Sequence, residues 1–280
     1  MIKYRLEITK GEPIRYISHL DFASLMQRAI CRAHLPAAYS EGFNPHMKIS
    51  FASALSVGIT SDAEYMDLEL KKDICQPELF DKLSKALPPG VRLLKARQID
   101  MRAKALMSIV DEASYSIVLP CQDDLNTVTK AINKFNQTKE IIVVRETPKK
   151  RKEIEIKQYL PKAMQYNLED NTLNISLNIK ITSTGTTKPN EILDVLKNEY
   201  KLNISVENAL VCRTGLYHQG VLTMPRAMEP FMFLPTQHRA TTRMSLWAVA
   251  ITSMVLRRTR TACLPSMPTM QSISKISRVM

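Results

Sequence analysis

The stretch 63–98, AEYMDLELKKDICQPELFDKLSKALPPGVRLLKARQ, decides the fold. Its first eight residues alternate polar Tyr65 and Asp67 with apolar Met66 and Leu68, which is the period of a strand. A predicted helix over Gln76–Leu87 carries its apolar side chains on one side, and the following Pro-Pro-Gly ends it. Val91–Gln98 then reads as a strand, so the stretch predicts strand, helix and strand in succession.

The residues before this stretch predict strand, helix and strand again. Lys3–Thr9 alternates as a strand, and Pro13–Ile17 extends it past a turn. A helix over His19–His34 follows, with Ser18 as a suitable N-cap. Lys48–Leu55 is the next predicted strand. The order of the first hundred residues is therefore β-α-β-β-α-β, which is typical of a ferredoxin-like unit.

The same order is predicted a second time with different residues. We expect strands at 114–119, 140–145, 152–156, 173–181 and 204–212, and helices at 123–135 and 190–200. The pair 140–145 and 152–156 is read as an insertion. The predicted fold class is α+β, with two tandem ferredoxin-like (βαββαβ) units over residues 1–105 and 106–217 and a poorly structured C-terminal tail.

Residues 218–280 differ in composition from the rest of the chain. Residues 1–214 carry 21 Lys and 10 Arg with a net charge of +5, whereas residues 215–280 carry 1 Lys and 7 Arg with a net charge of +7. Eight of the fifteen methionines also lie in this last quarter. We expect a basic tail that is disordered or shifted in reading frame; the alternative is a basic extension that binds RNA or a membrane surface.

Several classes of function lack their signature in this sequence. The five cysteines are more than forty residues apart and form no CxxC or Cys/His cluster, so we expect neither a metal site nor a disulfide framework. GxSxG, GxGxxG and HExxH are absent as well, so no cofactor and no catalytic residue is predicted. The N-terminus lacks the apolar core of a signal peptide and no run spans a membrane, which predicts a cytoplasmic protein without a membrane partner.

The loop YSEGFNPHMK at 39–48 is the first candidate site. Gly42 permits positive φ and Pro45 keeps Asn44 out of the helical region, so the backbone is tightly specified. Exposed amides beside His46 and Lys48 are suited to holding an anion such as phosphate. The alternative is a sharp turn that starts the next strand.

Three further stretches have both a functional and a plain interpretation. Gly185–Glu191, which contains Lys188, opens a predicted helix and suits a phosphate, although helix capping explains it equally. Pro148–Lys152 is a basic hairpin tip that contacts RNA or is simply solvated. Arg15–His19 puts a cation, an aromatic ring and an imidazole before a helix, where a nucleotide could stack, but capping by Ser18 explains most of it.

The chain closely resembles the radical SAM-linked (radical SAM-associated) protein family, domain of unknown function 2344, over about residues 1–217. The motifs that carry the resemblance are Tyr39-Ser40-x-Gly42-Phe43-Asn44-Pro45-His46-x-Lys48, Ser61-x-Ala63-Glu64-Tyr65-x-Asp67, Gly185-x-x-Lys188-Pro189 and Arg213-Thr214-Gly215-Leu216. Family members resemble this chain as stand-alone proteins or as the C-terminal part of a B12-binding radical SAM protein. The resemblance therefore implies a radical SAM partner and no reaction, and this chain lacks the CxxxCxxC motif of the radical enzyme. It departs from the family at Met47, where Pro is usual, and in its basic end.

These observations together predict a non-catalytic accessory module that presents RNA or another phosphate-bearing substrate to a radical SAM protein. The residues predicted to shape the site or contact the ligand are Ser18, His19, Tyr39, Gly42, Asn44, His46, Lys48, Lys188 and Arg213. One alternative is a metal-independent RNA-processing enzyme that uses His19 or His46 as acid–base. The other is a structural subunit whose loops dock the partner.

Overall fold

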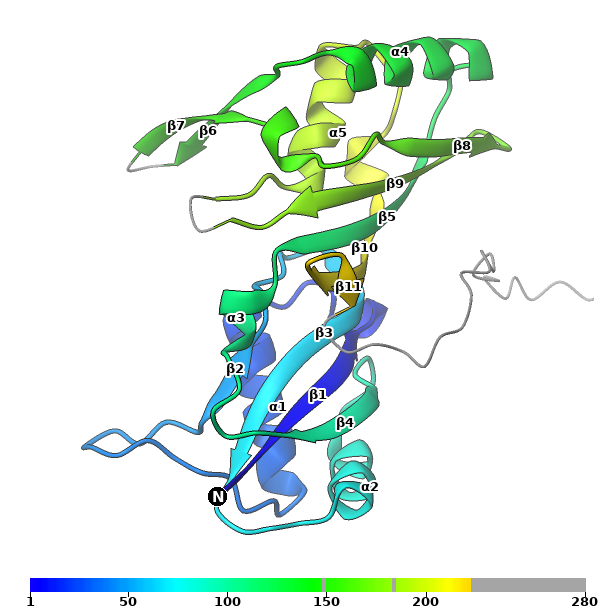
Figure 1. The fold of residues 1–280 in the computed structure, drawn as a ribbon. Helices are drawn as coiled ribbons and strands as arrows, with labels where there is room; N and C mark the ends of the chain where they lie inside the picture. Colours follow the sequence, from blue (N-terminus) through cyan, green and yellow to red (C-terminus); the bar gives the residue numbers. More distant parts are fainter. Residues whose placement is uncertain (148–149, 183–184, 223–280) are drawn as a thin grey trace, which may run out of the picture. The chain divides into compact units, whose positions relative to one another are not determined.

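The computed structural model describes residues 1–147, 150–182 and 185–222, all of which belong to one compact unit (Figure 1). The predicted tail at 218–280 therefore lies almost wholly outside the described residues. Only its first five residues are described, and they end a strand and form the short strand β11 (Val221–Leu222).

The first half of the described chain has the order strand, helix, strand, strand, helix, strand. Its elements are β1 (Ile2–Lys10), α1 (His19–Arg32), β2 (Ile49–Phe51), β3 (Ile59–Leu70), α2 (Gln76–Ala86) and β4 (Leu93–Ile99). The strands pair antiparallel in the order β4-β1-β3-β2. Both helices contribute to one apolar cluster with the sheet, which includes Leu6, Met26, Leu68 and Leu83.

The second half repeats this arrangement and adds a separate hairpin. Its elements are α3 (Leu106–Ile109), β5 (Glu112–Pro120), α4 (Leu125–Gln137), β6 (Ile142–Thr147), β7 (Lys150–Glu155), β8 (Gln165–Glu169), β9 (Thr172–Lys180), α5 (Pro189–Asn198) and β10 (Leu210–His218). The strand order is β10-β5-β9-β8, again antiparallel, while β6 and β7 pair only with each other. Helices α4 and α5 cover the buried face of this half.

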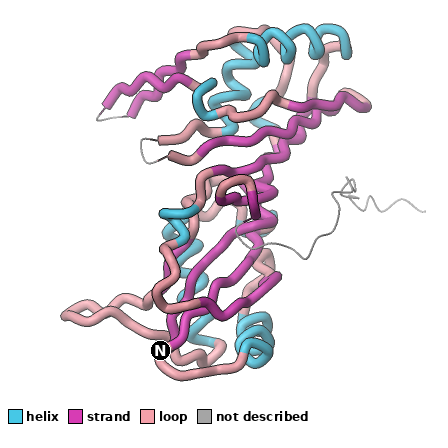
Figure 2. The backbone as a smooth tube through the Cα atoms, in the orientation of Figure 1, coloured by secondary structure: helices cyan, strands magenta, loops and turns pink. Residues whose placement is uncertain are grey.

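The two halves share one sheet. Ile59–Ser61 of β3 pairs with Val211–Arg213 of β10 in parallel, and this pairing joins the two four-stranded sets into one sheet, visible as the magenta band in Figure 2. With β11, which pairs with β10, the sheet has nine strands. Leu55 and Ile59 of the first half belong to the apolar core of the second half. The fold is α+β, as predicted, but the halves are joined by backbone hydrogen bonds rather than merely set side by side.

Several details differ from the sequence prediction. The strand predicted over Lys48–Leu55 spans only Ile49–Phe51, and the short helix α3 was not predicted. Strand β8 was missed because only Tyr166 and Leu168 face the core, which is too short an alternation to recognise. The last strand begins at Leu210 and not at residue 204, because Val206–Asn208 forms a 3₁₀ turn. Glu12–Ile14 is a 3₁₀ turn with Pro13 near its start, where a strand extension was expected.

Within the described ranges, no helix is long and apolar enough to cross a membrane.

Candidate functional site

The predicted loop forms an arm between α1 and β2 that extends away from the sheet in Figure 1. Its two sides are tied by backbone hydrogen bonds: the Ser40 N–H donates to the His46 carbonyl at 2.8 Å, and the Lys48 N–H donates to the Ala38 carbonyl at 2.8 Å. The Ser40 hydroxyl also accepts from the His46 N–H at 2.9 Å. Gly42 turns the tip with φ +119°, a conformation that favours glycine. The arm is therefore a hydrogen-bonded loop with a defined conformation.

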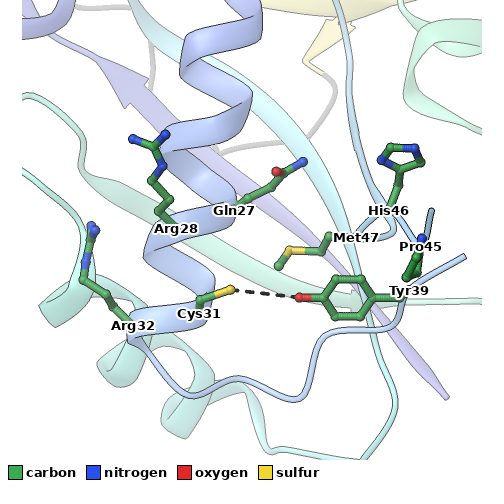
Figure 3. Close-up of a pocket in the computed structure, with 8 residues that line it drawn as sticks. All are labelled: Gln27, Arg28, Cys31, Arg32, Tyr39, Pro45, His46 and Met47. Atoms are coloured by element: carbon green, nitrogen blue, oxygen red, sulfur yellow. Dashed lines mark hydrogen bonds between the residues drawn. The ribbon is translucent and has the colours of Figure 1, made fainter.

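A hollow of about 510 Å³ lies between this arm and helix α1 (Figure 3). Its lining residues are Gln27, Arg28, Cys31, Arg32, Tyr39, Pro45, His46 and Met47. In Figure 3, Arg28 and Arg32 leave successive turns of the helix in the same direction, on the side away from Tyr39, Pro45 and His46, and Tyr39 points its hydroxyl at Cys31. We call this hollow the basic groove. Its lining brings Tyr39 and His46, which the sequence predicted for the site, together with residues of α1 that the sequence did not predict.

The charge of the basic groove is one-sided. Among the described residues that line it, none is Asp or Glu, whereas Arg28 and Arg32 are both exposed. Arg32 also donates to the Ala86 carbonyl at 2.9 Å, which holds its guanidinium against the end of α2. Lys71 adds a further positive charge 5.8 Å from the centre of the Tyr39 ring. The groove is therefore suited to an anion.

Tyr39 supplies a neutral donor in these positive surroundings. Partial burial, together with the contact to Cys31, raises the pKa of its hydroxyl. The Cys31 Sγ lies 4.0 Å from that hydroxyl, which is a weak interaction. The phenol is protonated at neutral pH and can donate a hydrogen bond to a ligand oxygen.

The other arm residues predicted for the site lie outside the lining of the groove. Gly42 and Asn44 belong to the exposed tip, and Gly42 shapes the turn. The Lys48 ammonium is 3.7 Å from the Glu69 carboxylate of β3. Ser18 caps α1, because its hydroxyl accepts a hydrogen bond from the Asp21 N–H at 3.1 Å. This agrees with the helix-capping interpretation of the Arg15–His19 stretch.

Arg213 and His19 lie in a second place, a buried cluster where β3, β10 and the end of β1 meet. Arg213 is 1% exposed and donates to both carboxylate oxygens of Glu64, with its Nε 2.8 Å from Oε1. Lys10 is equally buried, and its ammonium donates to the carbonyls of Arg15 and Ile17 at 3.1 and 3.0 Å. We call Lys10, Glu64 and Arg213 the buried ionic cluster, and the half-buried His19 lies beside it.

Burial sets the electrostatics of this cluster. It is the main reason that the pKa values of Lys10 and His19 are lowered, because the charged forms lose water, and Glu64 only partly opposes the shift. Burial acts on Arg213 in the same sense, but the nearby Glu64 outweighs it and the pKa of Arg213 is raised. His19 is therefore a neutral imidazole at pH 7, packed edge-on against Phe51 with ring centres 5.2 Å apart.

Lys188 lies in a third place, at the start of α5. The Lys188 N–H donates to the Glu191 carboxylate at 2.9 Å, Thr187 donates to the same carboxylate at 3.0 Å, and Pro189 occupies the first helical turn. Arg145 makes a two-pronged ion pair with Glu191 at 2.7 and 2.9 Å. Hydrogen bonding to Arg145 lowers the pKa of Glu191 against the effect of burial. The predicted residues thus divide among three places, and His46, Lys48, Lys188 and Arg213 do not line one cleft.

A second hollow of about 360 Å³ lies between the Arg15–Tyr16 turn and helix α5. Arg15, Asp194 and Glu207 all line it, so its lining mixes both signs of charge. Burial raises the pKa of Asp194. This hollow is less suited than the basic groove to a polyanion. Among the described residues, no three His, Cys, Asp or Glu side chains are gathered in a way that could hold a metal ion.

Comparison with known proteins identifies the family. The model of the family described as "Uncharacterized protein conserved in bacteria (DUF2344)" matches residues 3–189. The chain belongs to this family. The arm, helix α1 and most of the shared sheet fall inside the matched part of this DUF2344 chain, whereas Arg213 follows it. The family predicted from the sequence motifs is confirmed.

The comparisons with curated proteins and with solved structures identify no near relative. No curated protein matches the DUF2344 chain. A chain in the crystal structure of a Cbf5–Nop10–Gar1 complex is 9% identical, with a TM-score of 0.41, over 77% of this chain and 48% of that one, so the protein spans about half its length. An unknown protein from Galdieria sulphuraria is 9% identical with a TM-score of 0.23 over 73% of this chain and 96% of that one.

Sequence reasoning missed the arginines of the groove and the partners of Arg213. Arg28 and Arg32 are four residues apart and lie off the apolar stripe of α1, but nothing in their spacing showed that the arm folds beside them. Glu64 did carry a signal. It stands on the face of β3 that otherwise holds Met66, Leu68 and Leu70, where a carboxylate needs a buried partner.

Proposed function

We propose that this DUF2344 protein is a non-catalytic module that binds RNA through the basic groove. The observation that carries the proposal is the groove itself, whose described lining includes Arg28, Arg32 and His46 and no carboxylate. Phosphates of a nucleic acid backbone are the common cellular ligands of such a surface, because clustered cations release counterions on binding. The Tyr39 hydroxyl adds a donor for a phosphate or ribose oxygen.

The setting we propose follows the family resemblance. The protein would act in the cytoplasm and present its RNA to a radical SAM partner. We further propose that its two halves are tandem ferredoxin-like units, 1–105 and 106–217. Their matching strand orders, β4-β1-β3-β2 and β10-β5-β9-β8, support this assignment.

The test is the affinity for fluorescently labelled RNA measured by anisotropy. Arg28→Glu should weaken binding by about 10-fold or more, because it replaces an attractive charge with a repulsive one, and it should lower the slope of log affinity against log salt by about one unit. The matched control is Arg97→Glu. Arg97 is an exposed arginine of β4 whose neighbour Ala96 packs in the core, so Arg97 points to the opposite face of the sheet.

Equal losses from Arg28→Glu and Arg97→Glu would show that only net charge matters and would remove the groove as the site. The absence of any binding at low salt would end the RNA proposal. Cleavage of the RNA that His46→Ala or His19→Ala abolishes while binding persists would replace it by the enzyme alternative.

A further inference from the structure

The tip of the arm carries a large apolar side chain that contacts nothing in the described protein. Phe43 has a relative exposure of 106%, whereas among the other described phenylalanines Phe22, Phe51 and Phe135 are buried and Phe80 is 36% exposed. An aromatic ring of this size in water forgoes the burial that normally stabilises it. Phe43 therefore adds little to the stability of this chain, and its ring is accessible to a ligand.

The backbone that carries this ring is tightly specified. Gly42 before it adopts φ +119°, and Pro45 after it restricts Asn44. The hydrogen bonds between Ser40 and His46 close the arm directly below the tip. A ring presented on a closed turn loses little freedom on binding, which is the condition for an effective contact residue.

The ring is also close to the basic groove. Pro45 and His46 line the groove, and three peptide units separate the Cα atoms of His46 and Phe43, so these atoms are no more than about 11 Å apart. A nucleic acid strand bound between the arm and α1 would have nucleotides within reach of the tip of the arm. The positive charge of the groove favours a polyanion, and the bases of a nucleic acid supply flat faces on which an aromatic ring stacks.

We propose that Phe43 stacks on an unpaired base, and that the RNA bound by the groove is single-stranded. This inference rests on the proposed function and adds the class of RNA. A paired base in a helix already stacks on both neighbours, so only an unpaired or unstacked base can lie on a protein ring. The exposed amide of Asn44 stands beside Phe43 and can hydrogen-bond the edge of the stacked base.

The experiment compares Phe43→Ala and Phe43→Trp in the full chain, with labelled single-stranded RNA as the probe. Phe43→Ala should weaken binding about 5- to 100-fold, the usual range for loss of one stacking side chain, with an unchanged salt slope because no charge is lost. Phe43→Trp should bind at least as tightly as the natural protein. The matched control is Tyr16→Ala, which removes another highly exposed ring (71%) that lines the second hollow and not the groove.

In a second experiment, the complementary strand is annealed to the same RNA to form a duplex. The duplex should bind more weakly, and Phe43→Ala should then have no effect. If Phe43→Ala matches the natural protein on the single strand while Arg28→Glu still weakens binding, the stacking inference falls and the proposed function stands. If no RNA binds at low salt, both fall. If Phe43→Ala leaves RNA binding intact but abolishes association with a radical SAM protein, the ring docks a protein and the inference is wrong.

Discussion

Arg213 and Arg28 are the same side chain in opposite surroundings. Arg213 lies in the seam between the two halves, almost wholly buried and neutralised by Glu64 on the adjoining strand. Arg28 stands on the exposed side of α1 in a groove whose described lining holds no carboxylate. The first arginine is occupied in holding the fold, and the second is available to a ligand. The availability of a basic residue is decided by its neighbours in space, which its place in a motif does not reveal.

The largest expected effect comes from breaking the buried pair. Arg213→Met should lower the free energy of unfolding by about 3–5 kcal/mol, because Glu64 is left charged and unpaired in the core. Urea denaturation monitored by circular dichroism measures the change. Removing both charges with Glu64→Leu and Arg213→Met together should recover much of the loss. A loss below about 1 kcal/mol in the single variant would mean that water reaches the pair, contrary to the burial described.

A smaller effect is expected from the pH dependence of His19. The pKa of His19 is lowered from its ordinary value of 6.5, chiefly by burial, so in the pH range between the folded and unfolded values the unfolded chain binds more protons. The stability of the natural protein should therefore fall as the pH drops below about 6.5 and be retained above it.

His19→Gln should reduce this loss, because glutamine does not titrate. Thermal unfolding at pH 7.5 and pH 5.5 tests the difference, with the other histidines providing the same background in both proteins. Glu191, the pKa of which is lowered from 4.5, contributes only at more acidic pH. Identical pH dependence in the two proteins would show that His19 is hydrated in solution.

The smallest effect on stability is expected in the groove. Arg28→Met should change the free energy of unfolding by no more than about 0.5 kcal/mol, since an exposed side chain without a buried partner adds little. The same denaturation experiment tests it next to Arg213→Met. A cost as large as that of Arg213→Met would erase the distinction between the two arginines and make Arg28 a structural residue.

The sequence predicted secondary structure best where a periodic pattern runs over many residues. It predicted the site least well, because the site depends on contacts between residues far apart in the chain. The alternation in Leu173–Ile181 and the stripe of α1 predicted β9 and α1 nearly to the residue. The two residues of β8 that face the core were too few to recognise, and only the pairing of β8 with β9 defines the strand.

The site shows the same limit. Gly42, Asn44 and Pro45 predicted a specified turn, because each restricts its own backbone. That Tyr39 and His46 would meet Arg28 depends on how the arm lies against α1, which no local pattern contains. The buried ionic cluster had a readable signal in Lys10 and Glu64, since each interrupts an apolar alternation. Their convergence with Arg213 is a property of the seam, where residues 152 positions apart become neighbours.

The parallel pairing of β3 with β10 has a consequence for how the chain is made. Because synthesis runs from the N-terminus, the start of β3 emerges with an open edge and keeps it until residues 211–213 are available. During that interval Glu64 lacks its ion-pair partner Arg213, and the start of β3 has no strand on this edge. The seam between the two halves can therefore close only after most of the described chain has been synthesised.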